Sequence, residues 1–270
     1  MLEHRLFGTL NDYVDESRQI VEDAVERWQP ASVWAAFPGG NDSTVMLDVV
    51  HEYVDGVFHV DTTIGIRQTR QFVEETAVAY GLDLEVRKPS KSYEEIVRER
   101  GFFGPSDHEW AYRLLKKDAT RQFKRDMLPA RESSKLMLLT GMRAHESRTR
   151  LAHGSDDRVE ERIAWVNPLR HWTNTEMRLY REANPQVPKN PVNDLLGKSG
   201  ECLCGCFSHP VELDIIREID PQTAAQIEGL QAELEAAGSP FCRWGPGGAA
   251  SSVTAGPLCA DCAPLPIDGG

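Results

Sequence analysis

The sequence contains no apolar run that approaches the roughly 18 to 20 residues needed to cross a bilayer as a helix. Its first residues, MLEHRLFGTLNDY, also lack the basic and apolar regions of a secretory signal. These two absences predict a cytoplasmic protein with no membrane partner.

An excess of positive charge is missing as well, because 30 Lys and Arg residues stand against 42 Asp and Glu, for a formal net charge of −12. Nucleic-acid binding draws much of its affinity from clustered Lys and Arg that displace counterions from phosphates. The balance argues against a broad basic face for nucleic acid, and any such contact would have to be local. If DNA is a substrate, we expect a partner protein to present it.

Cysteine is absent before residue 202. The six cysteines are Cys202, Cys204, Cys206, Cys242, Cys259 and Cys262. In a reducing compartment such a cluster indicates metal binding or redox chemistry before disulfides. Thiolates are soft ligands, and four of them in a tetrahedron suit Zn²⁺ or an iron–sulfur cluster.

The expected metal ligands are Cys202 or Cys204 together with Cys242, Cys259 and Cys262. The last two have the spacing of a zinc knuckle. The first two are less usual ligands, since alternate residues of an extended segment point the same way but sit apart. Three interpretations stay open: a structural zinc that ties down the tail, an iron–sulfur cluster, and thiols without metal. A leftover early cysteine, such as Cys206, would be a free nucleophile or a sulfur carrier.

Short apolar runs alternate with helix-length segments after residue 31. Five runs predict buried strands: SVWAAF (32–37), VFHVD (57–61), LDLEVRK (82–88), KLMLLTG (135–141) and RIAWVNPL (162–169). This alternation predicts an α/β fold with a doubly wound, parallel five-stranded sheet. We also expect an amphipathic helix over 10–28, a helix from Thr173 or Asn174 to Pro185, and a helical hairpin within 210–237 broken near Asp220-Pro221.

The stretch AAFPGGNDSTVML (35–47) places two glycines between an apolar run and a helix-like run. A strand that ends in a glycine-rich turn and feeds a helix directs backbone N–H groups at one point, which suits a phosphate. Ser43 and Thr44 can cap the helix and add hydroxyl donors, while Asp42 can hold Mg²⁺ or orient the turn. Neither G-x-x-x-x-G-K-S/T nor G-x-G-x-x-G is present. The alternative is an ordinary strand-to-helix turn.

The segment PGGNDSTVML resembles the S-G-G-x-D-S pyrophosphate-binding loop of the adenine nucleotide alpha-hydrolase-like superfamily, which includes the ATP pyrophosphatases and the phosphoadenosine-phosphosulfate (PAPS) reductases. Four further stretches resemble the reductase branch in the same order. They are FHVDT (58–62), EWAYRLLKK (109–117), GMRAHESRTR (141–150) and NPLRHWTNTEMRLYREANPQVPKNPV (167–192). The matching family patterns are H-V-D-T, C-C-R-x-L-K, G-x-R-x-x-E-S-x-x-R, and P-L-x-x-W-T with a later N-P run.

The resemblance implies site residues for ATP or PAPS. Nucleotide binding is expected at Pro38, Gly39, Gly40, Asn41, Asp42, Ser43, Asp61, Arg113, Lys116, Arg143, Glu146 and Ser147. Within this set Arg113 and Lys116 would contact phosphate or sulfate, and Asp61 would lie at the carboxyl edge of the sheet. Catalytic roles are expected for Asp42, Ser43, Arg143 and Arg150, with Mg²⁺ neutralising the phosphates.

The sequence departs from the reductases in three places. Pro38 stands where the family usually has serine, the cysteine pair is replaced in the segment Trp110-Ala111-Tyr112-Arg113, and the C-terminus, CADCAPLPIDGG, lacks E-C-G-x-H. Reduction of PAPS by the usual thiol attack is therefore disfavoured. The organisation expected is a helical segment (1–31), a nucleotide-binding α/β domain (32–198), and a cysteine-rich metal-binding region with the helical hairpin (199–270).

The leading functional hypothesis is an ATP pyrophosphatase type of enzyme. It would activate a phosphate or carbonyl oxygen by adenylation for sulfur transfer, similar to the ATP-pyrophosphatase component of DNA phosphorothioation systems. A cysteine desulfurase would then be the sulfur donor. One alternative is a divergent PAPS or adenosine phosphosulfate reductase that takes electrons through the cysteine cluster. Another is a nucleotide-binding assembly module without turnover.

Overall fold

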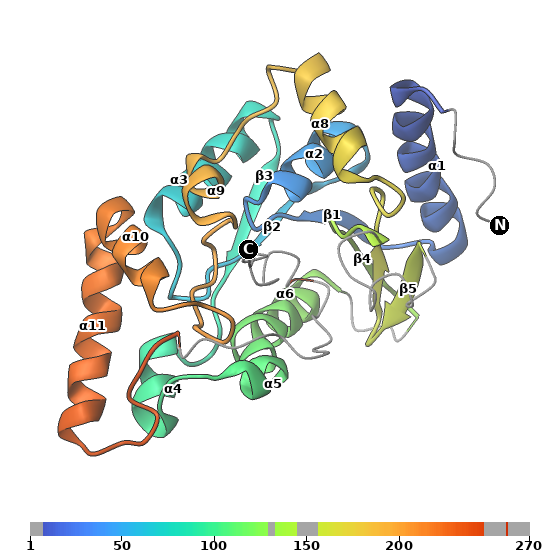
Figure 1. Ribbon diagram of the computed structural model, residues 1–270. Helices are drawn as coiled ribbons and strands as arrows, with labels where there is room; N and C mark the ends of the chain where they lie inside the picture. Colours follow the sequence, from blue (N-terminus) through green and yellow to red (C-terminus); the bar gives the residue numbers. More distant parts are fainter. Residues whose placement is uncertain (1–7, 129–132, 145–155, 246–257, 259–270) are drawn as a thin grey trace.

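The computed structural model describes residues 8–128, 133–144, 156–245 and 258 (Figure 1). The strands are β1 (Ser32–Ala36), β2 (Gly56–Val60), β3 (Asp83–Arg87), β4 (Leu136–Leu139), β5 (Asp157–Glu160) and β6 (Ile163–Val166). The helices are α1 (Leu10–Trp28), α2 (Asn41–Val50), α3 (Arg67–Ala79), α4 (Tyr93–Arg100), α5 (His108–Tyr112), α6 (Asp118–Met127), α8 (Asn174–Ala183), α9 (Pro191–Leu196), α10 (Val211–Ile219) and α11 (Pro221–Ala236). A π-helical turn (Arg113–Lys117) joins α5 to α6, and short 3₁₀ turns occupy His51–Tyr53 and Pro105–Asp107.

The strands form one sheet in the order β3-β2-β1-β4-β6-β5. The first five strands in this order are parallel, and β5 pairs antiparallel with β6. From β1 the chain adds β2 and β3 on one side of the sheet, and the next strand, β4, lies on the other side of β1. The carboxyl ends of β1 and β4 therefore flank a topological switch point, where open α/β sheets bind ligands.

The expected parallel strands are all confirmed, but the sheet has one strand more than the sequence predicts. The β5–β6 hairpin turns through Glu161 (φ 51°) and Arg162 (φ 68°). Two-residue hairpin turns of this kind usually contain Asn-Gly or Asp-Gly, because both positions need positive φ. Without those residues, and with only four residues in the mostly polar DRVE, β5 carries no clear strand signal.

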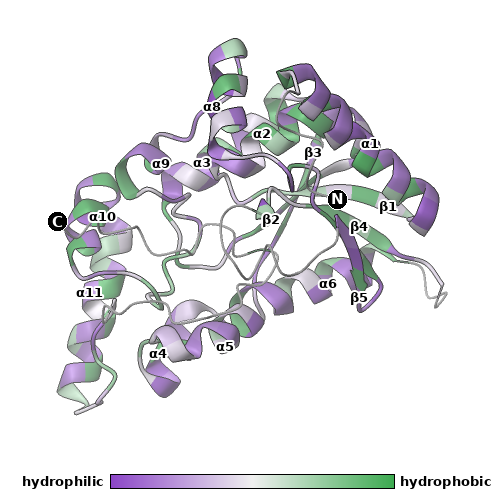
Figure 2. Cartoon of the chain, turned by 45° about the vertical axis from the view of Figure 1, so that its right-hand side comes forward, coloured by the Kyte–Doolittle hydropathy of each residue, from purple (hydrophilic) through white to green (hydrophobic). Residues whose placement is uncertain are grey.

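Helices cover both faces of the sheet, as Figure 1 shows, with α1, α2, α3 and α8 on one side and α6 on the other. The first face packs Ala35, Val57, Met137 and Leu139 against those helices. The second face packs the alternate residues of the same strands, including Trp34, Phe58 and Leu138, against α6. This division follows the two-residue alternation of a strand. In Figure 2 the inner strands β1 and β4 are largely hydrophobic, whereas the edge strand β5 is hydrophilic.

A separate cluster of buried residues, apart from the two faces of the sheet, joins α4 and α5 to α9, α10 and α11. The expected helical hairpin is confirmed as α10 and α11, and its break falls at Asp220, whose side chain accepts a hydrogen bond from the Thr223 N–H. The helix expected over 10–28 is α1, and the one expected from Thr173 is α8, which begins with a Thr173–Glu176 capping box. None of the described helices is both long and apolar enough to span a bilayer.

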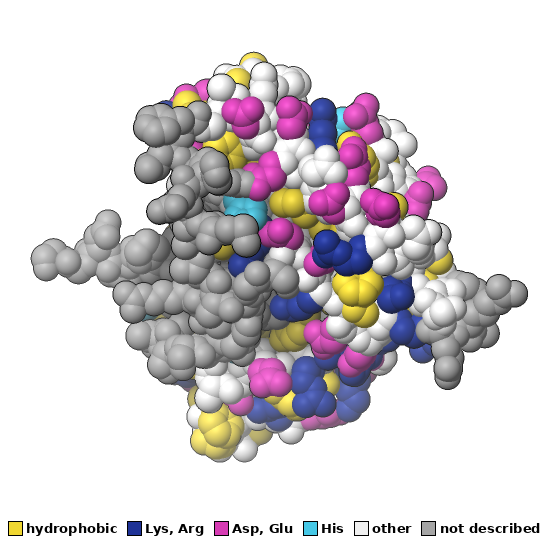
Figure 3. Space-filling model, turned by 90° about the vertical axis from the view of Figure 1, so that its right-hand side faces the viewer, with side chains coloured by type: hydrophobic (Ala, Val, Ile, Leu, Met, Phe, Trp, Pro, Cys, Tyr) yellow, Lys and Arg dark blue, Asp and Glu magenta, His cyan; other side chains and the backbone are white. Residues whose placement is uncertain are grey.

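The surface seen in Figure 3 mixes basic and acidic side chains. On α6 and the neighbouring turn, Lys117 and Arg121 form ion pairs with Glu160 and Glu161 of the β5–β6 hairpin. The positive charges of these two side chains are therefore paired with carboxylates of the hairpin.

Candidate functional site: a phosphate-type loop at the sheet edge

The glycine-rich turn follows β1 directly and reaches the switch point. Gly39 has φ +80°, and a Cβ there would lie 3.1 Å from Thr69 Cγ2 and 3.2 Å from Val73 Cγ2. Only glycine adopts this conformation readily, and here the neighbouring side chains of α3 also leave little room. The Gly39 carbonyl accepts a hydrogen bond of 3.0 Å from Asn190 Nδ2, while Asn190 Oδ1 accepts one from the Val192 N–H. Asn190 therefore fixes the loop and caps α9 at once.

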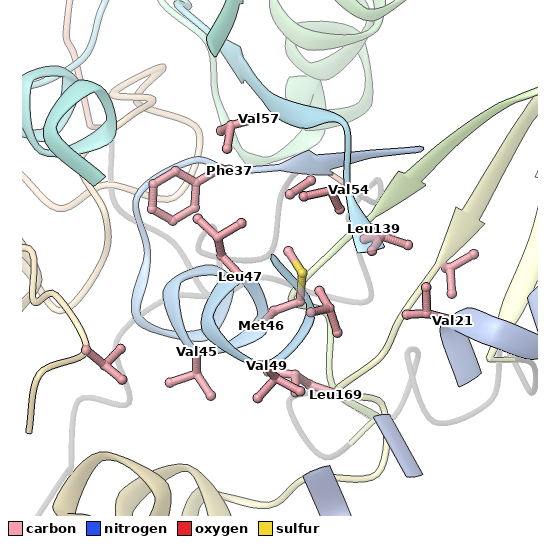
Figure 4. Packing of buried hydrophobic residues seen from close by; sticks show 14 of the residues in the cluster. Val21, Phe37, Val45, Met46, Leu47, Val49, Val54, Val57, Leu139 and Leu169 are labelled. Atoms are coloured by element: carbon pink, nitrogen blue, oxygen red, sulfur yellow. The ribbon is translucent and has the colours of Figure 1, made fainter. Parts of the chain in front are cut away.

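Helix α2 begins at Asn41 with its first turn free of a side-chain cap. Ser43 Oγ and Thr44 Oγ1 donate to the Gly40 carbonyl at 2.9 and 2.8 Å, so they do not cap the helix as expected. The first N–H groups of a helix have no partner within it, and the helix dipole makes this end positive. Figure 4 shows α2 anchored by Val45, Met46, Leu47 and Val49 in the core, which holds the uncapped end at the sheet edge.

The segment after β4 closes the other side of the turn. A Cβ on Gly141 would lie 2.7 Å from the Ser43 backbone nitrogen, so only glycine allows this approach. Two residues on, Arg143 Nε donates to Asp42 Oδ2 at 2.8 Å, and its NH1 group donates to Asn174 Oδ1 at 3.0 Å. Asp42 thus orients Arg143 across the loop, while its expected roles, to hold Mg²⁺ or to orient the turn, stay predictions. The other expected residues of this segment, Glu146, Ser147 and Arg150, lie outside the described residues.

Asp61 follows β2 at the same edge, as expected. Its carboxylate accepts from the Thr63 N–H at 2.9 Å and pairs with Arg70 and, at 3.5 Å, with Lys88. These groups line a cavity of about 280 Å³ between the β2–α3 connection and α11, together with His59, Thr69, Arg67, Gln222, Thr223, Gln226 and Glu201. That volume is near the lower end of ligand pockets, which suits a nucleoside-sized group.

Of the two basic residues expected to contact phosphate, the π-helical turn places Lys116 beside the site and Arg113 away from it. The Lys116 ammonium forms a 2.7 Å ion pair with Glu201, and the two side chains are only 5% and 4% exposed. It also donates to the Leu258 carbonyl at 2.7 Å. Lys116 borders a small cavity beside Pro38 and another beside Cys202 and Cys204. Arg113 is exposed and makes no hydrogen bond or ion pair with loop 38–44 in the described structure.

The cysteine region shows two neighbouring thiols. The Cys202 thiol interacts with its neighbour Cys204, so this pair does not sit apart as expected, and that interaction, with burial, raises the pKa of Cys202 well above its usual value. Cys206 is buried and Cys242 half-buried, while Cys259 and Cys262 fall beyond the described part of the chain. No three His, Cys, Asp or Glu side chains converge as a metal site among the residues described. The expected ligand set, Cys202 or Cys204 with Cys242, Cys259 and Cys262, stays a prediction.

Two site residues, His59 and Asn190, were not predicted. Their partners are distant in sequence, since His59 Nδ1 contacts the Phe37 carbonyl at 2.9 Å and Asn190 contacts Gly39. The Asn-Pro pair at 190–191 was the available signal, because Asn followed by Pro is typical of a helix start.

Comparisons with known proteins agree with this architecture. A crystal structure of PAPS reductase from Candida auris, in a phosphate complex, has a TM-score of 0.50 and 23% identity, covering 70% of this chain and 91% of that one. The U34-tRNA thiolase NcsA of Methanococcus maripaludis, with its [4Fe-4S] cluster, has a TM-score of 0.45 and 17% identity, covering 84% and 80%. At 23% identity the likeness to the reductase concerns the fold alone.

An uncharacterized protein of Methanocaldococcus jannaschii is 24% identical over 195 residues, which are 69% of this chain. The chain spans 44% of the length of that relative. Residues 32–207 match the model of the phosphoadenosine phosphosulfate reductase domain, and this segment includes the loop, Asp61, Lys116, Arg143 and the first three cysteines. The chain therefore belongs to the PAPS reductase domain family, within the adenine nucleotide alpha-hydrolase-like enzyme superfamily.

Proposed function

We propose that this chain binds an adenine nucleotide at the carboxyl edge of its sheet, with the phosphates on residues 38–44 and the nucleoside in the 280 Å³ cavity. One observation carries the proposal: a glycine with φ +80° leads into the uncapped helix α2 at the switch point. The unpartnered N–H groups of that turn and the helix dipole favour an anion. Thr69 lies beside Gly39 of the loop, shares the Asn190 amide with it, and also lines the cavity, so the two subsites adjoin.

The reaction that family membership favours is a divergent reduction of a sulfonucleotide, PAPS or adenosine phosphosulfate. In this reaction the bond between sulfur and the phosphate oxygen breaks, sulfur(VI) becomes the sulfur(IV) of sulfite, and the nucleotide leaves with the oxygen. Two thiols supply the two electrons, become a disulfide, and are reduced again by the dithiol of thioredoxin. Cys202 and Cys204 are the candidate thiols, because both line a cavity with Lys116. Since the raised pKa of Cys202 keeps that thiol protonated, Cys202 would act as the second, resolving thiol.

A second candidate is supported by the residues that are missing. The segment from Trp110 to Arg113 and the C-terminus both lack the reductase cysteines. In this candidate an acceptor oxygen attacks the α-phosphorus of ATP, pyrophosphate leaves, and a sulfur nucleophile displaces AMP. The loop and Arg143 would act by positioning and charge stabilisation, with Mg²⁺ carried on the nucleotide. DNA phosphorothioate modification is the setting proposed, with a partner presenting DNA and a cysteine desulfurase donating sulfur.

Product analysis separates the two candidates. The full chain is incubated with PAPS or adenosine phosphosulfate plus reduced thioredoxin, and separately with ATP, Mg²⁺ and a sulfur donor. Sulfite release supports the reductase, whereas AMP with pyrophosphate supports the adenylating enzyme. Tight binding of a nucleotide without any product supports the remaining alternative, a nucleotide-binding assembly module without turnover. Absence of binding to all three nucleotides contradicts the proposal.

A pair of glycine variants tests the loop itself. Gly39→Ala places a Cβ against Thr69 and Val73, whereas Gly81→Ala at φ +65° meets nothing within 4 Å. Both pay a left-handed backbone cost of about 1 to 2 kcal/mol. We expect Gly39→Ala to weaken ATP binding about tenfold or more, measured by calorimetry, and Gly81→Ala to leave it unchanged. Equal affinities for both variants would place the phosphates elsewhere.

A further inference from the structure

A buried histidine lines the 280 Å³ cavity. His59 lies near the end of β2 and is 3% exposed. Its Nδ1 atom is 2.9 Å from the Phe37 carbonyl oxygen, at the start of the glycine-rich turn. A carbonyl oxygen only accepts hydrogen bonds, so Nδ1 carries the proton. The loop thereby fixes the tautomer of the ring.

The other nitrogen, Nε2, is a lone-pair acceptor in this tautomer. It has no hydrogen-bond partner among the described residues, and it is not one of the fully enclosed polar atoms of the structure. Burial lowers the pKa of His59, which keeps the ring neutral. His59 therefore lines the cavity as a neutral ring whose one acceptor is Nε2.

A neutral acceptor cannot pair with a phosphate oxygen, because both are acceptors. The cavity supplies other groups for anions, since Arg70 and Lys88 line it beside Asp61. The partner of Nε2 is thus a hydrogen-bond donor on the base or the sugar.

We infer that His59 is a specificity-determining residue whose Nε2 selects nucleosides with a hydrogen-bond donor at this point, either the 6-amino group of adenine or a ribose hydroxyl. The inference rests on the proposed nucleotide binding in this cavity and adds a named acceptor to it. Sites that hydrogen-bond a substrate group discriminate against analogues without that group, because the buried partner is left unpaired.

The test compares ligands on the wild-type chain by calorimetry. AMP carries both donors, IMP replaces the 6-amino group by a carbonyl, and 2′-deoxy-AMP and 3′-deoxy-AMP each lack one hydroxyl. A loss of affinity of about two- to tenfold for one of these analogues is expected, which corresponds to one neutral hydrogen bond. Loss with IMP assigns the amine, and loss with a deoxy analogue assigns the hydroxyl.

The variant His59→Asn keeps a donor for the Phe37 carbonyl and removes the acceptor at Nε2. It should bind AMP about two- to tenfold more weakly than wild type and lose the analogue preference. His51→Asn is the matched control, since His51 Nδ1 also contacts a backbone carbonyl, Asp48 O at 2.8 Å, away from the cavity.

Three outcomes separate the proposals. Wild-type affinity for AMP that equals its affinity for every analogue overturns the role of His59, and this result needs no variant to fold. Unchanged AMP binding and preference in His59→Asn overturns it as well, while nucleotide binding stands. No binding of AMP or any other adenine nucleotide by the wild type overturns both.

Discussion

The buried pair of Lys116 and Glu201 gives the sharpest test of the electrostatics at the site. The two side chains are 5% and 4% exposed, with Nζ and Oε2 2.7 Å apart. Glu201→Gln removes the negative charge while keeping the shape, and it leaves the ammonium with the Leu258 carbonyl at 2.7 Å. Breaking a buried pair from one side costs about 3 to 5 kcal/mol. Because the carbonyl still accepts a hydrogen bond, we expect a loss near the lower end, about 3 kcal/mol in the free energy of unfolding.

Urea unfolding measures this loss as a lower midpoint at unchanged m-value. The double variant Lys116→Met/Glu201→Leu removes both charges and fills a similar volume, so it should recover stability to within about 1 kcal/mol of wild type. Glu160→Gln is the matched control, since it breaks the surface pair with Lys117 and should cost at most about 1 kcal/mol. The reasoning is refuted if Glu201→Gln is as stable as Glu160→Gln, or if the double variant is no more stable than Glu201→Gln.

Three further outcomes are expected. Tyr180→Phe removes the hydroxyl that donates to Asp48 Oδ2 at 2.5 Å, while Tyr80 still donates to Oδ1 at 2.6 Å; the variant should lose about 1 to 2 kcal/mol in urea unfolding, and no loss would contradict the role of this network. Burial lowers the pKa of His59, so below about pH 6.5 the unfolded chain takes up a proton that the folded chain does not. The free energy of unfolding that neutral His59 contributes is then lost as pH falls, by at most about 1.4 kcal/mol per pH unit. The free energy of unfolding of His59→Asn should therefore decline less steeply between pH 7 and 5.5 than that of the wild type. If the thiolate set of Cys202 or Cys204 with Cys242, Cys259 and Cys262 binds metal, anaerobically purified chain should contain zinc, or iron with acid-labile sulfide, that a chelator removes together with part of its thermal stability; a chain free of metal as purified would contradict this set and favour thiols without metal.

The parallel strands could be predicted because each is a short apolar run with its own local boundaries. The β5–β6 hairpin could not, because its turn conformation is stabilised from outside the segment. Glu161 accepts from Arg121 Nε at 3.0 Å and pairs with Lys117 at 3.2 Å, and these contacts lower its pKa to about 2. Glu161 therefore holds its positive φ while its side chain is paired with Arg121 and Lys117. These partners lie about 40 residues earlier in the chain, so no local sequence pattern reveals them.

The glycine-rich loop was likewise visible in the sequence, since its residues are contiguous. The surrounding partners were not. Ser43 is a hydroxyl in a position that suits capping, yet the tight turn brings the Gly40 carbonyl within 2.9 Å of it, and the hydroxyl donates there instead. Lys116 is a cation in a phosphate-contact motif, but its present partner is a carboxylate from a remote segment. Pairwise contacts of this kind depend on the fold, and spacing alone does not specify them.

The pairing also explains how a chain with net charge −12 can hold an anion at this edge. Pro38 adds neither a hydroxyl nor an N–H to the loop, so the backbone after it and the end of α2 must carry more of the attraction. The nearby carboxylates are Asp42, Asp61 and Glu201, and the cations paired with them are Arg143, Arg70, Lys88 and Lys116. Arg70 also pairs with Glu74, so four cations face four carboxylates and these pairs cancel locally. The acid excess elsewhere is weakened beyond a Debye length of about 8 Å at physiological ionic strength, so these local pairs and the helix dipole set the potential that a phosphate meets.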